Sequence, residues 1–308
     1  MIKRSALLLC LVILPLSAAQ AKDESWFGNS KQWAQKLWQN DEKNWLERIN
    51  SAVLNHNYAG VIVIAQGSNI ESLAVEHKML NGKETLRLKT LSGLPRELLK
   101  IDGQIKTNAL PKQYQRSSTG AGDQAALSQF ARAWDNENYR VKLAETSRVA
   151  GRNTQVIDIK AHDDLRYSYR LWLDIETGLP LKVLTRDEKN NTIEQMAFTQ
   201  ISIEPVKIKT ELVKNTPSKA LKNPYKDVKG FKLMAKEIKG SSQHYLYSDG
   251  LVSVSVYIDP SKQREQVQMK KKSVNGLILG NGISRTAVIG KIPMRTLELF
   301  LLSTQNQN

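Results

Sequence analysis

Apolar and polar residues alternate between positions 164 and 186 (DLRYSYRLWLDIETGLPLKVLTR), and this pattern predicts a β-hairpin. One face of its first arm carries two tyrosines and two leucines: Tyr167, Tyr169, Leu171 and Leu173. The other face carries polar and cationic side chains and one tryptophan: Arg166, Ser168, Arg170 and Trp172. Gly178 can take the positive φ of the turn, and Pro180 can open the return arm without costing a ladder hydrogen bond. The predicted sheet therefore has an apolar face opposite a cationic one.

The same alternation predicts a long antiparallel meander. Its strands cover residues 58–66, 70–79, 84–91, 139–150, 154–160 and 193–203, with two short strands around Asp102-Gly103. Asn81-Gly82 is the strongest hairpin signal. Residues 26–56 and 124–134 follow helical spacing instead. We predict an α+β fold whose large domain is an unclosed antiparallel β-barrel, or half-barrel, covered by helices. Such a barrel can hold an apolar ligand between sheet and helices.

A second, smaller α/β domain is predicted at the C-terminal end. The alternation stops over residues 206–225, where prolines and lysines indicate a linker. Beyond it, residues 242–259 form a hairpin with Asp249-Gly250 as a type I′ turn, residues 282–289 form a strand, and a closing helix begins near Pro293. The predicted organisation is a signal peptide (1–21), a large domain (22–205), a linker (206–225) and a small domain (226–308).

The first residues predict export. Lys3 and Arg4 precede an apolar run over residues 6–16 that is too short to span a bilayer, and Ala19-Gln20-Ala21 fits a cleavage site. An uncleaved anchor is the alternative. The one cysteine, Cys10, lies in this run, so the mature chain has no disulfide and depends on a hydrophobic core.

Charge narrows the choice of partner. Removing Lys3 and Arg4 lowers the formal net charge from +15 to +13. A basic exported protein suits phosphate-bearing lipid head groups, acidic polypeptides, or sulfated and carboxylated sugars, and export disfavours nucleic acid. Solubility alone is the alternative explanation of spread charge.

Candidate catalytic chemistry is sparse. No pair of the four histidines has metal-ligand spacing, and no nucleophile motif is present. His162, Asp163 and Asp164 are adjacent on an extended chain, so their side chains do not converge. The sequence predicts a binding protein rather than an enzyme, with no catalytic residue, no metal and no cofactor.

The predicted hairpin also carries a family resemblance. Residues 167–174 (YSYRLWLD) followed by 177–181 (TGLPL) resemble the signature hairpin of the RseB/MucB proteins. Residues 45–60, 246–251 and 288–293 resemble that family's first helix, its small-domain hairpin and its last strand-to-helix junction. The similarity covers nearly all of the chain after Trp45. The apolar run 275–282 (NGLILGNG) and the Trp-rich stretch over residues 26–45 depart from the family pattern.

The resemblance implies a periplasmic negative regulator of the sigma-E envelope stress response. Such a protein binds the periplasmic domain of a membrane-spanning anti-sigma factor (RseA/MucA-like) and protects it from site-1 proteolysis. It releases the anti-sigma factor when it binds lipopolysaccharide or lipid-like ligands. The resemblance also implies a large domain like that of lipoprotein carriers, and self-association as a homo-oligomer.

Two candidate sites follow. Lipid chains would lie against Tyr167, Tyr169, Leu171 and Leu173, with phosphates near Arg170; core packing is the alternative explanation of these side chains, and the one that the sequence favours. The anti-sigma factor would meet Tyr247, Asp249 and Gly250, for which a plain turn is the alternative. Two other functions stay open: a periplasmic carrier or receptor for lipoproteins or lipids, and an enzyme acting on envelope glycan through Asp163 or Asp164.

Overall fold

The structure is a computed structural model. It describes residues 42–49, 51–52, 55–80, 83–101, 104–106, 130, 136–206, 221–271 and 273–305. All of them belong to one compact unit, which spans residues 41–308. The predicted signal peptide, the segment 26–40, most of the predicted helix 124–134 and most of the predicted linker lie outside the described residues. None of the described helices is both long enough and apolar enough to cross a membrane.

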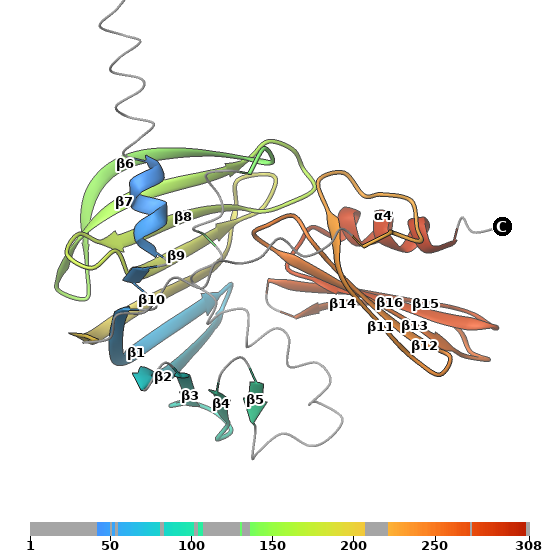
Figure 1. Cartoon of the computed structure of the whole chain (residues 1–308), viewed down its shortest axis with the longest axis horizontal. Coiled ribbons are helices and arrows are strands. Elements are labelled where there is room, and N and C mark those ends of the chain that lie inside the picture. Colours follow the sequence, from blue (N-terminus) through green and yellow to red (C-terminus); the bar gives the residue numbers. More distant parts are fainter. Residues whose placement is uncertain are drawn as a thin grey trace, which may run out of the picture. The chain divides into compact units, whose positions relative to one another are not determined.

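A ten-stranded antiparallel sheet accounts for the first half of the described chain (Figure 1). Its strand order is β5-β4-β3-β2-β1-β10-β9-β8-β7-β6, so β5 and β6 are its edges and the sheet does not close. The strands are β1 (His56–Gln66), β2 (Asn69–Leu80), β3 (Lys83–Thr90), β4 (Glu97–Ile101), β5 (Gln104–Lys106), β6 (Tyr139–Val149), β7 (Arg152–Ala161), β8 (Ser168–Asp174), β9 (Pro180–Arg186) and β10 (Thr192–Pro205).

A helix over residues 42–49 and 51–52 packs on the apolar face of this sheet (Figure 1). Leu46, Ile49 and Ala52 on it are fully buried, in the same hydrophobic cluster as Leu171. The predicted α+β fold, an unclosed antiparallel sheet with a helix on its apolar face, is confirmed.

The predicted hairpin is present as β8 and β9. Gly178 has a φ of +80°, and a Cβ there would lie 2.8 Å from the Cβ of Arg48 on the helix, so glycine lets the turn and the helix approach each other. Asp174 ends β8 and accepts hydrogen bonds from Arg152 Nε (2.8 Å) and from the backbone N–H of Thr177 (3.0 Å). Pro180 opens β9, as predicted.

A six-stranded antiparallel sheet follows, in the order β11-β12-β13-β16-β15-β14. Its strands are β11 (Lys232–Lys239), β12 (Ser242–Ser248), β13 (Ser253–Pro260), β14 (Arg264–Lys271), β15 (Val274–Asn281) and β16 (Ser284–Gly290). Helix α4 (Met294–Gln305) packs against β15 and β16 and buries Leu297, Phe300 and Leu301, the stripe that the sequence predicts.

The predicted type I′ turn at Asp249-Gly250 is wrong. Pairing between β12 and β13 ends at Ser248 opposite Ser253, so four residues connect the strands. The reason is the Asp249 side chain: its Oδ1 accepts the backbone N–H groups of Leu251 and Val252, both at 2.9 Å, and this builds a wider turn.

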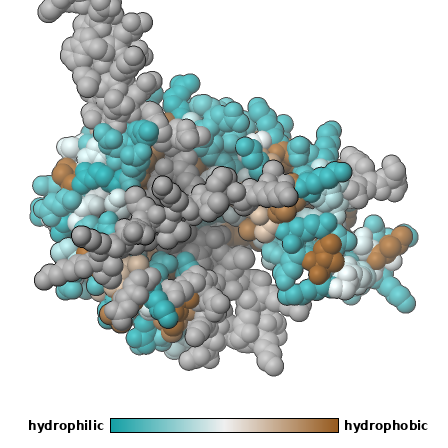
Figure 2. Space-filling view, in the orientation of Figure 1, coloured by the Kyte–Doolittle hydropathy of each residue, from teal (hydrophilic) through white to brown (hydrophobic). Residues whose placement is uncertain are grey.

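The visible surface is mostly hydrophilic, with separate hydrophobic patches (Figure 2). Ile238 on β11 and Ile283 in the turn before β16 are 55% and 83% exposed. The core instead follows the covered face of each sheet and continues between the two sheets.

Candidate functional site

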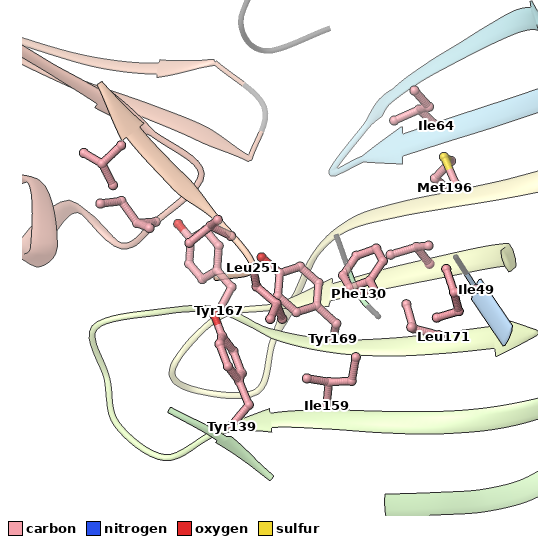
Figure 3. Packing of buried hydrophobic residues seen from close by; sticks show 14 of the residues in the cluster. Ile49, Ile64, Phe130, Tyr139, Ile159, Tyr167, Tyr169, Leu171, Met196 and Leu251 are labelled. Atoms are coloured by element: carbon pink, nitrogen blue, oxygen red, sulfur yellow. The ribbon is translucent and has the colours of Figure 1, made fainter. Parts of the chain in front are cut away.

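The predicted lipid-binding face is occupied by the chain's own side chains. Tyr167, Tyr169, Leu171 and Leu173 are at most 5% exposed. Figure 3 shows Tyr169 and Leu171 beside Phe130 and Ile49, and the rings of Tyr169 and Phe130 meet edge to face with centroids 5.1 Å apart. In this structure these positions are core, the alternative that the sequence left open.

One polar atom in this cluster has no partner within the described part of the chain. The Tyr169 hydroxyl is buried and makes no hydrogen bond there. Burial raises its pKa well above the usual value for tyrosine, and the Asp249 carboxylate adds to the effect. A buried hydroxyl without a partner costs about 1–3 kcal/mol, so it marks a place where the apolar packing is not optimal for stability.

Tyr167 connects the large sheet to the small one. Asn275 on β15 donates from Nδ2 to the Tyr167 hydroxyl (2.9 Å) and to the backbone carbonyl of Ile292 (2.7 Å). Leu251 of the small sheet lies next to Tyr167 in Figure 3. The apolar cluster therefore ends at a polar junction between the sheets.

Arg166 is the centre of this junction. It is 1% exposed, and its Nε lies 3.1 Å from Asp249 Oδ2 across the junction. Its Nη1 donates to Asp163 Oδ2 (3.1 Å) and its Nη2 to the backbone carbonyl of Lys229 (2.9 Å). The guanidinium also lies 5.2 Å from the ring of Phe231. The charge of this buried arginine is paired with two carboxylates, which is the condition for burying a charge, although its Nε makes no hydrogen bond within the described residues.

The prediction that Arg166 lies on the cationic face is wrong. Strand β8 begins at Ser168, so the alternation of side chains does not extend back to residue 166. The backbone at this point is held instead by Asp163, whose Oδ1 accepts the N–H of Leu165 (3.2 Å).

Of the predicted partner-binding residues, Tyr247 and Asp249 are buried near the same junction and Gly250 is half-buried. Asp249 Oδ2 also accepts the hydroxyl of Tyr139 (2.9 Å), and its backbone carbonyl accepts Asn136 Nδ2 (2.5 Å). Gly250 has a φ of +100°, and a Cβ there would lie 2.8 Å from Asn136 Nδ2. The Tyr247 hydroxyl donates to Asn223 Oδ1 (2.9 Å). Two sites predicted separately, on hairpins far apart in sequence, are thus brought together by the fold.

A second buried charge, Glu194 near the start of β10, also connects the two sheets. Glu194 is 4% exposed and accepts the hydroxyl of Ser273 (2.7 Å). It also pairs with Lys291 and accepts Gln66 Nε2. No local pattern in the sequence singles out Arg166, Glu194 or Asn275, because each has at least one partner far away in the sequence.

Arg170, the cation assigned to the lipid site, lies on the opposite face of β8. Its Nη2 donates to Glu145 Oε1 (2.5 Å), and its guanidinium lies 5.7 Å from the ring of Trp172. The sheet separates it from Tyr167 and Tyr169, because neighbouring residues of a strand point to opposite faces. The predicted pairing of lipid chains and phosphate therefore does not form one continuous site here.

Two unclosed antiparallel sheets with buried ion pairs between them define an α+β protein. The chain belongs to the MucB/RseB family: the model of the MucB/RseB N-terminal domain matches residues 41–221, and that of the C-terminal domain matches residues 223–305.

Similar proteins cover nearly the whole chain. The sigma factor AlgU regulatory protein MucB of Pseudomonas aeruginosa is 26% identical over 294 residues, 85% of this chain and 90% of that protein. The sigma-E factor regulatory protein RseB of Salmonella typhimurium is 25% identical over 281 residues, 82% and 86% of the two chains. Among solved structures, MucB in complex with MucA(peri) matches with a TM-score of 0.63 and 25% identity, over 83% of this chain and 96% of that one.

Proposed function

We propose that this protein is a regulator that binds the periplasmic domain of a membrane-spanning anti-sigma factor. Membership of both halves of the chain in the MucB/RseB family carries this proposal. The relatives are described as sigma factor regulatory proteins, and a similar solved structure is a complex of MucB with MucA(peri). The protein acts in the periplasm after loss of residues 1–21, and it acts by binding, without catalysing a reaction.

Protection and release complete the proposed cycle. The bound regulator shields the anti-sigma factor from site-1 proteolysis, and an amphiphile such as lipopolysaccharide releases it. An acyl chain that enters the cluster around Tyr169 has to displace Phe130 or the helix that carries Ile49, since these side chains fill it. Tyr167 is part of the same cluster and bonds to Asn275, so the displacement reaches the small sheet.

The experiment uses the purified protein and the periplasmic domain of the anti-sigma factor encoded in the same genome. We expect a complex by calorimetry, slower cleavage of the anti-sigma factor by the site-1 protease, and faster cleavage once lipopolysaccharide is added. Absence of a complex would contradict the regulatory function. A complex without protection would leave only the binding function.

The carrier function gives a different result in the same assay. A carrier passes its lipid to an acceptor and needs no anti-sigma factor. Transfer of a lipoprotein between purified membranes, with no complex formed, would favour it. The buried ion pairs between the small and the large sheet support the regulator instead. Through them, a ligand bound in the apolar cluster of the large sheet can affect the small sheet.

A further inference from the structure

The outer face of β6–β9, opposite the apolar cluster, carries a row of cations. Arg140 on β6 pairs directly with Lys160 on β7, and Ser168 on β8 pairs with Arg186 on β9. Ile159 lies opposite Tyr169, so the next residues, Lys160 on β7 and Ser168 on β8, are also neighbours. The two pairs therefore lie side by side and form one row across the four strands. We call Arg140, Lys160 and Arg186 the cationic row. Together with Lys142 they line a cavity of about 520 Å³.

The cationic row is unfavourable for folding. Like charges directly opposite each other on neighbouring strands destabilise a sheet, and Arg140 and Lys160 are such a pair. Within the described residues, none of the three cations of the row forms an ion pair, although Arg186 Nη1 donates to Asn190 Oδ1 (3.4 Å). The stability of the sheet therefore does not account for this arrangement.

Most carboxylates of the same cavity are already engaged. Asp158 lies 3.7 Å from Arg170, Asp163 bonds to the buried Arg166, and Asp187 accepts the backbone N–H of Lys189 (3.0 Å). Glu188 is exposed at the side of the cavity. The cationic row and Lys142 carry four positive charges against the two negative charges of Asp187 and Glu188, so a net positive charge is left for an anion from outside the chain.

A tryptophan flanked by cations lies on the same face. The Trp172 ring has Lys182 Nζ 4.4 Å from its centroid and the Arg170 guanidinium 5.7 Å from it. Trp172 is only partly buried, whereas Val156, directly opposite it on β7, is fully buried. A partly exposed indole beside lysine and arginine is the composition that proteins use at the boundary between lipid head groups and water.

We propose that the outer face of β6–β9 docks on the anionic phospholipid head groups of a bilayer. Lipid phosphates neutralise the cationic row, and Trp172 lies at the head-group level. This inference goes beyond the proposed function: it gives the protein a contact with the membrane that does not depend on the anti-sigma factor. Each cation near an anionic surface contributes to such binding, and the contribution falls with added salt.

The test measures co-sedimentation of the purified protein with vesicles of phosphatidylcholine alone or with added phosphatidylglycerol. We expect binding only to the anionic vesicles, with an affinity that falls as salt is added. The double variant Arg140→Gln, Lys160→Gln should bind roughly 30-fold more weakly. The matched control, Lys232→Gln with Lys270→Gln, removes the same charge from exposed positions of the small sheet and should change binding by no more than about twofold.

Thermal unfolding separates a lost site from a lost fold. Removing the opposed charges should leave the melting temperature of the double variant unchanged or raised, since the like-charge repulsion disappears. Its affinity for the anti-sigma factor's periplasmic domain should not change, so failure here is distinct from failure of the proposed function. Equal loss of vesicle binding in the two double variants, or equal competition by soluble poly-glutamate and by anionic vesicles, would overturn the proposal. So would a wild-type protein that ignores anionic vesicles.

Discussion

Replacing Arg166 by methionine tests whether the two sheets act as one body. The substitution removes a charge that is 1% exposed and leaves Asp249 buried without its ion-pair partner. Removing one member of a buried ion pair costs about 3–5 kcal/mol. We take this range to include the loss of the hydrogen bond from Arg166 to the Lys229 carbonyl. We therefore expect the free energy of unfolding to fall by about 4 kcal/mol.

Arg295→Met is the matched control. Arg295 on α4 pairs with Asp164, so it also links the two sheets, but the two side chains are 66% and 49% exposed. An exposed pair contributes about 0–1 kcal/mol, so the same chemical change should cost far less here. The contrast between the two variants isolates burial as the cause.

Urea unfolding followed by tryptophan fluorescence and by far-ultraviolet circular dichroism gives both values. With the junction intact, we expect one cooperative transition that both probes report together. In Arg166→Met we expect two transitions, because the buried ion pair that couples unfolding of the small sheet to that of the large one is lost. The reasoning is refuted if Arg166→Met and Arg295→Met lose the same stability, or if the wild-type protein already unfolds in two steps.

Three further predictions follow from single contacts. Gly178→Ala should lower the free energy of unfolding by about 2–4 kcal/mol, because both the φ of +80° and the nearby helix oppose a side chain there. The control Gly151→Ala has the same φ of +80° but open space around it, so it should cost only about 1 kcal/mol. Equal losses in the two variants would contradict the close approach of the helix to Gly178. Tyr169→Phe should leave stability unchanged or raise it, whereas Tyr167→Phe should cost about 1–2 kcal/mol by removing one of the two hydrogen bonds of Asn275 Nδ2; the reverse order would mean that the Tyr169 hydroxyl has a partner. Burial alone would raise the pKa of Asp174, but hydrogen bonds from Arg152 and Thr177 outweigh it and lower the pKa below its usual 3.8. Its stabilisation is therefore present at neutral pH and lost as the pH falls below about 4, so acid titration of Asp174→Asn should show a smaller loss of stability than the wild-type protein.

Local alternation was sufficient to predict the strands of the large sheet. Tyr167 to Leu173 alternate over a full strand, and the turn glycine Gly178 and the strand-opening Pro180 are set by backbone geometry that acts within a few residues. Strand β14 was missed because it is polar along its length (REQVQMKK), as an exposed edge strand can be. Strand β15 was missed because Gly276 and Gly280 interrupt its apolar pattern.

The junction could not be predicted in the same way. Tyr139 and Asp249 are 110 positions apart, and nothing in either neighbourhood indicates the other. Asp-Gly favours a tight turn locally, but Asp249 uses its carboxylate for two backbone N–H groups, for Tyr139 and for Arg166, and the wider turn follows from these contacts. Long-range polar partners overrode a local turn preference here.

The two faces of β8 lie in different surroundings. Tyr167 and Tyr169 point toward the cluster and the junction, so whatever disturbs them also strains the bond to Asn275 and the buried pair of Arg166. Ser168 and Trp172 point the other way, among cations that the fold does not neutralise. Because alternate residues of one strand serve both faces, a lipid docked on the proposed outer site and a lipid inserted into the cluster would both act on the same seven-residue strand. Substitutions on one face that alter binding at the other would show that the strand transmits the effect, and independent effects would show that the sheet keeps the two functions apart.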